Sequence, residues 1–583
     1  MLDIEKAYNK NFTKLNQKLP KSVNKFFIKM LQKLFHEKTF NDISAQNHYH
    51  KNLDFAASMI ELLGIKYLVE PNELSNIPSS GRILIVANHI TGASDAFTLV
   101  QLIGNLRENK KVKVMVNGML MGMEQAVDLL IPVDNISGSI TKKSFQAINE
   151  ALQNEEAVII FPAGIVSRLT LKGIKDSPWK PSFLKIARKN HSPILPIRIE
   201  ARNSILFYLV SLILPKKFSG LLLPREFAIA GKLPPLRYHI GKVIPPASFS
   251  TKNKEITTQE YVETFYELLY NLGTKRASLL KTQTTIIAPT DKMLLKAEVE
   301  TAQQLGRTLD NKRIILAEAQ NAPFLIRELG RVREISFRAI GGGTGKSRDN
   351  DLYDEYYKHI ILWDDEALEV VGAYRIGEVK EIVQERGMQG LYTYDFCNYD
   401  HTFEDYIDTS VELGRSFVQP KYWGSRALDN LWQGVGAYLA KNPNIIYTYG
   451  TVTINADTPK KAVAALVYFY SRYFSCKNTT MQAKTPYIMS KELKKEFDTL
   501  FNAQTYKENF VILKQYLKDL NTSVPTLFKQ YTELYEEGAV KFLDFSVNDA
   551  LHGVVEGFIM ADNSKMKASK RKRYIKNFEV KND

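Results

Sequence analysis

Short apolar runs separated by helical stretches are the feature of this sequence that most restricts its fold. They begin after residue 82 and read Ile83-Leu84-Ile85-Val86, Val112 to Val116, Val158-Ile159-Ile160-Phe161 and Ile194-Leu195-Pro196-Ile197. Runs of this length between turns are typical of buried strands, and their alternation with helical segments predicts an α/β fold. We therefore expect an α/β domain over residues 66–285.

A second series of the same kind lies further along the chain. Its predicted strands are His359 to Trp363, Val370 to Arg375 and Ile446 to Val452, with a helix at Leu428 to Ala440. We expect a second α/β domain over residues 326–583, joined to the first by a helical or extended connector over 286–325. The length of 583 residues agrees with this division, because a single core stops growing beyond roughly 250 to 300 residues.

Residues 1–65 are expected to form an amphipathic helical segment. Apolar residues recur at helical spacing among its lysines, namely Phe26, Phe27, Met30, Leu31, Leu34 and Phe35. Such a helix can lie on a membrane or cap a domain. The start of the chain lacks the apolar core of a secretory signal, so we expect the cytosol or the cytoplasmic side of the inner membrane.

No apolar run reaches the roughly 18 to 20 residues that a membrane-spanning helix needs. The nearest is Ile205 to Leu214, broken only by Ser211 and followed by Pro215-Lys216-Lys217 and Leu221-Leu222-Leu223. Two structures fit this pattern. One is an interfacial segment over 205–223 that enters one leaflet with its lysines at the head groups, and the other is a buried core helix.

The charge of the chain is uneven. Its formal net charge is +15, and residues 1–290 hold 38 Lys and Arg against 23 Asp and Glu, whereas residues 291–583 hold 40 of each. Within residues 151–250 the count is 15 basic against 5 acidic. Such a segment attracts anionic lipid, an acidic carrier protein or nucleic acid. No helix-turn-helix, zinc or RNA-binding signature is present, so nucleic acid is not expected as a partner.

Two other features set limits on the function. Cys397 and Cys476 lack CxxC or Cys/His spacing, so neither a disulfide framework nor a metal site is expected. A basic run near the C-terminus is predicted to be a solvated tail, with an electrostatic membrane tether as the alternative. Its members are Lys565, Lys567, Lys570, Arg571, Lys572, Arg573 and Lys576.

The first candidate site follows the predicted strand that ends at Ala87. Asn88-His89 leads to Asp95 there, at the strand end where open α/β sheets place their active sites. A hydroxyl that attacks a thioester needs a base, and an imidazole base needs a carboxylate to fix its tautomer. Six residues of straight helix turn through about 600°, so the chain must bend at Thr91-Gly92 to bring His89 and Asp95 together.

A second element leaves the strand that ends near residue 161. It reads Phe161-Pro162-Ala163-Gly164-Ile165-Val166-Ser167-Arg168. Gly164 lets the backbone approach a ligand closely, and Arg168 is suited to hold an anionic group. Arg198, Arg202 and Asn203 are further candidates, because they follow another strand end.

Together these residues resemble the glycerolipid acyltransferase family, whose marks are Asn-His-x4-Asp and Phe-Pro-Glu-Gly motifs. The likeness covers residues 66–240, with a five-residue gap between His89 and Asp95 and with Ala163 in place of the Glu. Both departures match the haemolysin-like acyltransferases, including the O-acyltransferases of ornithine-lipid synthesis, although Ile165 departs from that branch. The resemblance implies that His89 is the base, that Asp95 is its partner and that Phe161 to Arg168 line the acceptor pocket.

A glycine-rich run, Gly341-Gly342-Gly343-Thr344-Gly345-Lys346-Ser347, looks like a phosphate-binding loop but lacks the required first glycine, where Ile340 stands. It also follows helix-like sequence rather than a buried strand. We interpret it as a flexible loop near a substrate.

Four charged motifs surround that run. They are Arg333-x3-Phe337, Asp351-x-x-Asp354, Gly372-Ala373-Tyr374-Arg375 and Glu412-x-x-Arg415. Each by itself has the character of an ordinary surface ion pair. In this order they resemble the acyl-homoserine-lactone synthases and ornithine N-acyltransferases, which share the acetyltransferase-like (GNAT-like) fold. That fold splays two strands to admit an acyl-pantetheine, whose thioester the amine attacks directly.

An amino-acid substrate arrives as an ammonium and must lose a proton, for which Glu412 is the expected base. In the alternative, Asp351 and Asp354 hold the ammonium, while Arg375 or Arg415 binds a carboxylate or orients Glu412. The resemblance implies a bifunctional aminolipid synthase without a metal or nucleotide cofactor. The second half joins a 3-hydroxyacyl group from acyl carrier protein to ornithine or a similar amino acid, and the first half esterifies the hydroxyl of the lyso-lipid. The alternative is a lysophosphatidic acid acyltransferase with an accessory second domain.

Overall fold

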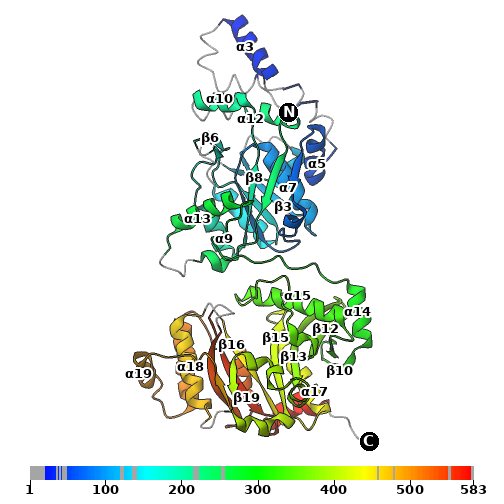
Figure 1. Cartoon of the computed structure of the whole chain (residues 1–583), viewed down its shortest axis with the longest axis vertical. Coiled ribbons are helices and arrows are strands. Elements are labelled where there is room, and N and C mark those ends of the chain that lie inside the picture. Colours follow the sequence, from blue (N-terminus) through cyan, green and yellow to red (C-terminus); the bar gives the residue numbers. More distant parts are fainter. Residues whose placement is uncertain are drawn as a thin grey trace. The chain divides into compact units, whose positions relative to one another are not determined.

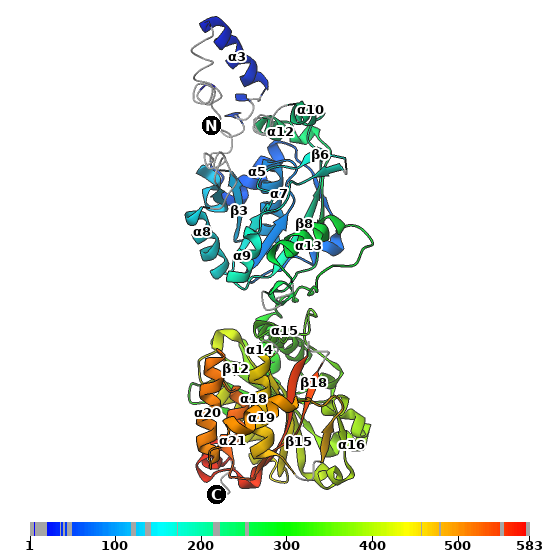
Figure 2. The same cartoon turned by 90° about the vertical axis from the view of Figure 1, so that its left-hand side faces the viewer.

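The computed structural model describes residues 5, 20–34, 37–38, 41–42, 49–117, 124–133, 141–171, 173–213, 222–250, 256–455, 458–476, 480–548 and 553–578. Its contacts divide the chain into two compact units, Met1–Thr285 and Ile286–Asp583. Each unit has a central sheet with helices packed on it (Figures 1 and 2). The α/β class predicted for both halves is confirmed.

The first unit contains a seven-stranded sheet in the order β1-β9-β8-β2-β5-β3-β4. The four predicted apolar runs are the strands β2, β3, β5 and β8. In β2 and β5 every residue is buried, and β2 pairs in parallel with both β5 and β8. The strands are β1 (Tyr67–Val69), β2 (Ile83–Ala87), β3 (Val112–Asn117), β4 (Leu130–Val133), β5 (Ala157–Ile160), β8 (Ile194–Glu200) and β9 (Leu236–Ile240), with a separate hairpin of β6 (Arg168–Thr170) and β7 (Gly173–Lys175).

Helices cover both faces of this sheet. One face packs against α5 (Asn52–Leu62) and α7 (Ala93–Leu106). The other face packs against α8 (Lys142–Gln153), α9 (Ser182–Lys189) and α13 (Thr258–Asn271). The predicted boundary at residue 66 is therefore wrong, because α5 places Phe55, Ala56 and Met59 in the core of the domain.

Two apolar helices lie on the outside of the first unit. The amphipathic segment forms α3 (Lys21–Leu34), where Phe26 and Met30 are exposed, and Phe35 lies outside the described residues. The run from Ile205 forms α10 (Ile205–Ile213), and α12 (Leu223–Ala228) follows the undescribed residues 214–221. Among the described residues, no helix has the length and apolar character to cross a membrane.

The helix α10 is not a core helix, which removes one of the two structures that fit its sequence. Phe207 is its only fully buried residue, whereas Ile205, Leu209, Leu212 and Ile213 are between 51% and 79% exposed. Phe207 packs with Val166 and Leu222, and Leu31 of α3 contacts the same small cluster. An exposed apolar surface therefore adjoins the Phe161 to Arg168 segment.

The second unit contains an eight-stranded sheet in the order β10-β11-β12-β13-β15-β16-β19-β18. Neighbouring strands of this sheet pair antiparallel, with the exception of β15 and β16, which pair in parallel. The strands are β10 (Gln303–Arg307), β11 (Arg313–Ala317), β12 (Lys358–Asp364), β13 (Glu369–Glu378), β15 (Ser410–Val418), β16 (Tyr447–Ile454), β18 (Val540–Asn548) and β19 (Val554–Asp562), and a separate ladder joins β14 (Cys397–Tyr399) to β17 (Met481–Ala483).

The helices of the second unit also divide between the two faces of the sheet. One face holds α14 (Lys292–Thr301) and α15 (Pro323–Ala339), with α16 (Val379–Arg386) beside them. The opposite face holds α17 (Ala427–Lys441), α18 (Lys460–Phe474), α19 (Lys491–Leu500), α20 (Tyr506–Asp519) and α21 (Thr526–Leu534). The predicted connector is wrong, because residues 286–325 supply α14 and the strands β10 and β11 of this sheet.

The basic C-terminal run is not a free tail over its described residues. It forms α22 (Ala568–Arg571) and a following turn over Lys572–Lys576, in which Tyr574 and Ile575 are buried. Arg573 and Tyr574 bind the carboxylate of Asp429 at the start of α17. Two consecutive buried residues, Tyr574 and Ile575, thus anchor a segment in which Lys565, Lys572 and Lys576 are exposed.

This packing gives a test of the C-terminal anchor. A Cβ atom on Gly436 of α17 would lie 1.9 Å from the backbone oxygen of Tyr574. We expect Gly436→Ala to lower the free energy of unfolding of the second unit by about 1 to 3 kcal/mol, the usual cost of overpacking. Denaturant unfolding measures it. Gly342→Ala is the control, because the nearest atom lies 3.9 Å away; equal effects of the two changes would contradict this packing.

Candidate active sites

His89 and Asp95 meet at the carboxyl end of β2. The strand ends at Ala87 and α7 begins at Ala93, with Gly92 between them at φ 78°. This left-handed turn, which suits glycine, brings His89 Nδ1 to 3.0 Å from Asp95 Oδ2. The structure thus contains the bend that the spacing of the two residues requires.

Asp95 is fixed in place by several donors. Its carboxylate accepts hydrogen bonds from the backbone N–H groups of Ile90 at 2.7 Å and Thr91 at 2.9 Å, and from the Thr91 hydroxyl at 2.5 Å. It also lies in the first turn of α7, where the helix dipole favours a negative charge. A carboxylate held in this way keeps the proton of neutral His89 on Nδ1 and leaves Nε2 as the basic nitrogen.

The Phe161 to Arg168 segment supports the ring of His89. Phe161 stacks on it with the ring centroids 4.2 Å apart. The backbone N–H of Ser167 donates to the carbonyl oxygen of His89 at 2.5 Å, and Gly164 turns the chain at φ 70°. The carbonyl oxygen of Pro162 accepts from the backbone N–H of Lys180 at 3.1 Å, which ties the segment to the loop before α9.

The sequence also predicted Asn88, Asn203, Arg202 and Arg168 for this site, and the structure places each of them in different surroundings. Asn88 exchanges two hydrogen bonds with the backbone of Ile199 in β8, so it joins strands. Asn203 donates to the carbonyl oxygen of Ile90 at 2.8 Å and holds the loop that carries His89. Arg202 is exposed, and the guanidinium of Arg168 lies 5.0 Å from the ring centroid of Phe207 in α10. Arg168 thus adjoins α10 through Phe207, and the backbone N–H of Asn203 donates to the Tyr208 hydroxyl of the same helix at 3.1 Å.

Asp176 belongs to this site and was missed by the sequence analysis. Its buried carboxylate accepts hydrogen bonds from the Ser167 hydroxyl at 2.5 Å, from Trp179 Nε1 at 2.9 Å and from the backbone N–H of His89 at 3.2 Å. Burial raises the pKa of Asp176 to about 6, against these hydrogen bonds. The signal in the sequence was an Asp three residues before a Trp, a weak pattern without the fold.

The raised pKa makes a stability prediction. The native state binds the Asp176 proton more tightly than the unfolded state, so the associated stability is present below about pH 4 and is lost as the pH rises through 6. We expect Asp176→Asn to become more stable relative to the wild type by about 2 to 3 kcal/mol between pH 4 and 7. Hydrogen exchange of β2 peptides measures opening of this unit.

Asp128→Asn is the matched control, because Asp128 is exposed on the same unit. It should follow the wild type at every pH. A constant difference between Asp176→Asn and the wild type across this range would show that Asp176 does not have a raised pKa.

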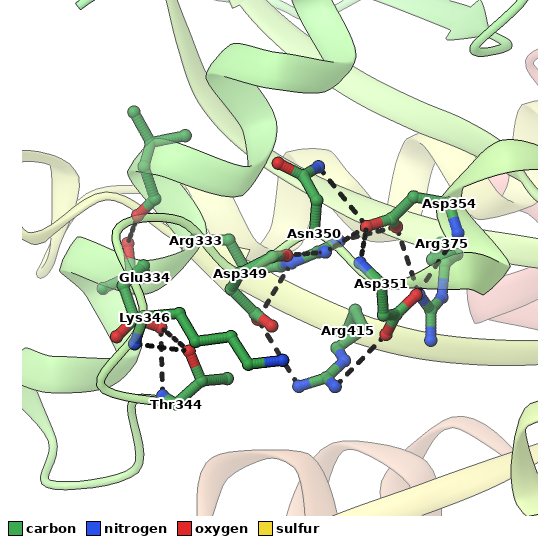
Figure 3. Close-up of polar contacts among 12 residues, drawn as sticks. Arg333, Glu334, Thr344, Lys346, Asp349, Asn350, Asp351, Asp354, Arg375 and Arg415 are labelled. Carbon is green, nitrogen blue, oxygen red and sulfur yellow. Dashed lines mark hydrogen bonds and ion pairs between the residues drawn. The ribbon is translucent and has the colours of Figure 1, made fainter. Parts of the chain in front are cut away.

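The second site is a buried group of three arginines and three aspartates, which we call the Arg–Asp cluster (Figure 3). Its members are Arg333, Arg375, Arg415, Asp349, Asp351 and Asp354. Arg333 of α15 binds Asp354 at 2.6 and 3.1 Å and Asp349 at 3.0 Å. Arg375 of β13 binds Asp351 at 2.5 Å and Asp354 at 3.1 Å. Arg415 of β15 binds Asp349 at 3.4 Å and Asp351 at 3.3 Å. All four predicted motifs thus contribute to the cluster, and Asp349 is the member that the sequence did not predict.

Members of the cluster differ in exposure and in charge environment. The side chains of Arg333, Asp354 and Arg375 are at most 3% exposed, whereas Asp351 is 24% and Arg415 is 15% exposed. Burial alone would raise the pKa of Asp354, but Arg333 and Arg375 outweigh it and hold this pKa far below its usual range. Asp351 and Arg415 therefore form the accessible edge of a cluster that is otherwise internally paired.

Arg415 stands at a β-bulge beside an opening in the sheet. The register of β13 and β15 shifts between Ala373–Phe417 and Arg375–Gly414, and Arg415 has φ 49°. The parallel pairing of β15 with β16, both fully described, runs only from Ser410 with Tyr447 to Leu413 with Gly450. Past Gly450 the two strands separate, which gives the splayed pair expected for an acyl-pantetheine. We call this opening the β15/β16 fork.

Glu412 and Phe337 do not belong to the cluster. The Glu412 carboxylate is buried and accepts from the Tyr357 hydroxyl, from Tyr392 N at 3.0 Å, and from Thr393 N and Oγ1 at 2.8 and 2.6 Å. The four hydrogen bonds occupy the acceptor sites of both carboxylate oxygens, so this geometry argues against Glu412 as the base. Phe337 packs in the apolar layer beneath α15.

The glycine-rich run is a turn after α15 rather than a phosphate-binding loop. Backbone N–H groups of Thr344 and Gly345 donate to the buried Glu334 carboxylate at 3.0 and 2.8 Å, and Arg338 Nε donates to it at 2.7 Å. The N–H groups that would surround a phosphate are therefore occupied by a carboxylate (Figure 3). The sequence predicted a flexible loop near a substrate, whereas the structure has a loop that is anchored on Glu334.

Comparison with known proteins assigns a family to each of the two units. Residues 11–235 match a family model described as Acyltransferase, and residues 332–433 match one described as Acetyltransferase (GNAT) domain. The chain is thus an acyltransferase with one domain of the O-acyltransferase type and one of the N-acyltransferase type.

Individual relatives define the family more closely. The chain is 34% identical over 306 residues to a glycine N(alpha)-acyltransferase of Bacteroides thetaiotaomicron, covering 50% of this chain and 90% of that protein. It is 28% identical over 276 residues to a lyso-glycine lipid O-acyltransferase of Phocaeicola vulgatus, covering 47% and 95%. An L-ornithine N(alpha)-acyltransferase of Brucella abortus is 25% identical over 169 residues, covering 28% and 57%. The chain belongs to the family of the glycine N(alpha)-acyltransferases.

Proposed function

We propose that this chain carries out two consecutive acyl transfers to one amino acid. The second unit forms an amide between a 3-hydroxyacyl group, delivered by acyl carrier protein, and the α-amine of the amino acid. The first unit then esterifies the 3-hydroxyl of that lyso-lipid with a second acyl group. One observation carries the proposal: a single chain contains both sites. The His89–Asp95 pair lies in the first unit, and the Arg–Asp cluster lies beside the β15/β16 fork of the second.

The second unit supports the first reaction by its accessible charged edge. Arg415 can hold the α-carboxylate of an amino acid by a charge-assisted pair, next to the fork that receives the thioester. We propose glycine as the amino acid in place of ornithine, because the relatives named for glycine share more identity over more of their length than the relative named for ornithine. Ornithine remains the alternative that the experiment distinguishes.

The first unit supports the second reaction by the dyad of His89 and Asp95. Nε2 of His89 is suited to take the proton of the 3-hydroxyl as it attacks the second thioester. Arg168, beside the apolar surface of α10, is our candidate for binding the carboxylate of the lyso-lipid. The excess of basic residues in this half suits both an acidic carrier protein and an anionic membrane.

The proposed lyso-lipid carries an acyl chain and therefore resides in a membrane. The proposed function thus includes binding of the chain to the cytoplasmic side of that membrane. We propose that the exposed residues of α10 and α3 enter one leaflet and bring the acyl chain to the Phe161 to Arg168 segment, which they adjoin through Val166.

The identity of the base and of the amino acid are tested together. In a host without aminolipids, we expect the wild-type chain to produce a diacylated glycine lipid and His89→Ala to accumulate the N-acylated lyso-lipid. Loss of a general base lowers the rate by about 10² to 10⁴, so the diacyl product falls at least about a hundredfold. Mass spectrometry of the lipid extract measures both. His50→Ala, an exposed histidine in the same unit, should retain the full lipid.

Three results would contradict the proposal in different ways. Diacylated lipid from His89→Ala would exclude His89 as the base. Ornithine lipid in place of glycine lipid would correct the substrate. Phosphatidic acid formed from lysophosphatidic acid, without any amide product, would favour a lysophosphatidic acid acyltransferase.

The membrane surface has its own test. We expect Leu212→Glu, at a residue that is 64% exposed on α10, to lower partitioning to phosphatidylglycerol-containing vesicles by about tenfold or more, because burial of a leucine contributes about 1.5 to 3 kcal/mol. Vesicle sedimentation measures it. Leu309→Glu, at a 94% exposed residue of the other unit, is the control. Equal binding of both variants would exclude α10 as the contact.

A further inference from the structure

A second buried carboxylate lies near the fork and has few partners. Glu556 of β19 is 3% exposed, and among the described residues it makes one hydrogen bond, from Asn548 Nδ2 at 3.0 Å, and no ion pair within 4.0 Å. This contrasts with Glu412, whose carboxylate accepts from four donors. Unlike Glu412, Glu556 therefore retains the capacity to bind a substrate group.

The register of the sheet places Glu556 beside the open part of the fork. Glu556 pairs with Thr453 of β16, three residues beyond Gly450, where the pairing of β16 with β15 ends. Alternate residues of a strand share a face, so Glu556 lies on the same face as Phe558 and Met560. These two residues pack in one cluster with Tyr357 and Tyr392.

That face is also the one that carries the Arg–Asp cluster. The guanidinium of Arg375 lies 4.8 Å from the ring centroid of Tyr392, and that of Arg415 lies 5.3 Å from it. Burial raises the pKa of Glu556, and the Asn548 hydrogen bond and the charge of Arg415 oppose the rise. Arg415 belongs to β15 and Glu556 to β19, which pairs with β16, so the guanidinium and the carboxylate come from opposite sides of the fork.

The charges of the cluster leave Arg415 as the arginine that can take another anion. Its pairs to Asp349 and Asp351 are the longest, at 3.4 and 3.3 Å, and its Nε has no hydrogen-bond partner among the described atoms. Arg375 Nη2 also has no such partner, but the side chain of Arg375 is 1% exposed, whereas that of Arg415 is 15% exposed. A zwitterionic amino acid with its carboxylate at Arg415 would direct its ammonium away from this positive charge. Glu556 is the carboxylate on the opposite side of the fork.

We infer that Glu556 accepts the proton of the substrate ammonium in the amide-forming reaction, an assignment that rests on the proposed function. The ammonium gives one proton to the Glu556 carboxylate and becomes an amine. The amine nitrogen then forms a C–N bond to the thioester carbonyl carbon as the C–S bond breaks, and its second proton leaves with the thiolate as a thiol. Glu556 returns to its carboxylate form when it releases the proton to water, so each turnover yields one amide, one thiol and one proton.

The test uses the purified full-length chain with glycine and a 3-hydroxyacyl thioester of acyl carrier protein. We expect Glu556→Gln to lower kcat for amide formation by at least about a hundredfold at pH 7, within the usual contribution of a general base. Its rate should rise about tenfold per pH unit, as free amine forms without a base, while the wild-type rate rises less steeply. Glu556→Asp, which keeps the carboxylate, should retain more activity than Glu556→Gln.

Controls separate a chemical role from a structural one. Glu556→Gln should still O-acylate a supplied N-acyl lyso-lipid, because that reaction belongs to the first unit. Glu412→Gln, at the saturated carboxylate, should lower the melting temperature and keep the wild-type pH profile. The inference is overturned if Glu556→Gln stays within threefold of the wild type at pH 7, or if its pH profile matches the wild type. An absence of amide from the wild-type chain would instead contradict the proposed function.

Discussion

The second unit depends on a backbone conformation that is costly for the residue that adopts it. Arg415 lies in the left-handed region at φ 49°, and such positions cost about 1 to 3 kcal/mol unless their surroundings fix them. Here the ion pairs to Asp349 and Asp351 hold the side chain. The bulge lies where β15 leaves β16, past Leu413, so the cluster is positioned at one edge of the fork. A buried ion network of this kind is weak evidence of stability and better evidence of a specified geometry.

Both units separate carboxylates that fix structure from groups that are left to react. In the first unit Asp95 is saturated by backbone and hydroxyl donors, and the imidazole of His89 keeps one nitrogen for chemistry. In the second unit Glu412 and Glu334 are saturated in the same way, and Glu556 has a single donor among the residues that the structure describes. The number of donors around a buried acid is therefore a more direct guide to its role than its place in a motif.

Much of the fold could be predicted from the sequence, because buried parallel strands are continuous apolar runs. The strand before His89 and the bend at Gly92 follow from such a run and from the spacing of a pair of residues. Asp176 and Glu556 could not be predicted, because their partners are brought together by folding and lie far from any shared pattern. Glu412 was assigned as a base from its motif, and its four donors come from segments that the motif does not include.

The strand β10 was assigned to a connector because its sequence, Gln303-Gln304-Leu305-Gly306-Arg307, has one buried residue and none of the apolar texture of the other strands. It forms one edge of the eight-stranded sheet. An edge strand offers unpaired N–H and C=O groups to any other chain, and polar, charged and irregular edges discourage such pairing. The register shift at Gly306 adds such an irregularity. The polarity that made β10 hard to recognise in the sequence is thus a property that suits an edge strand, because it discourages pairing with another chain.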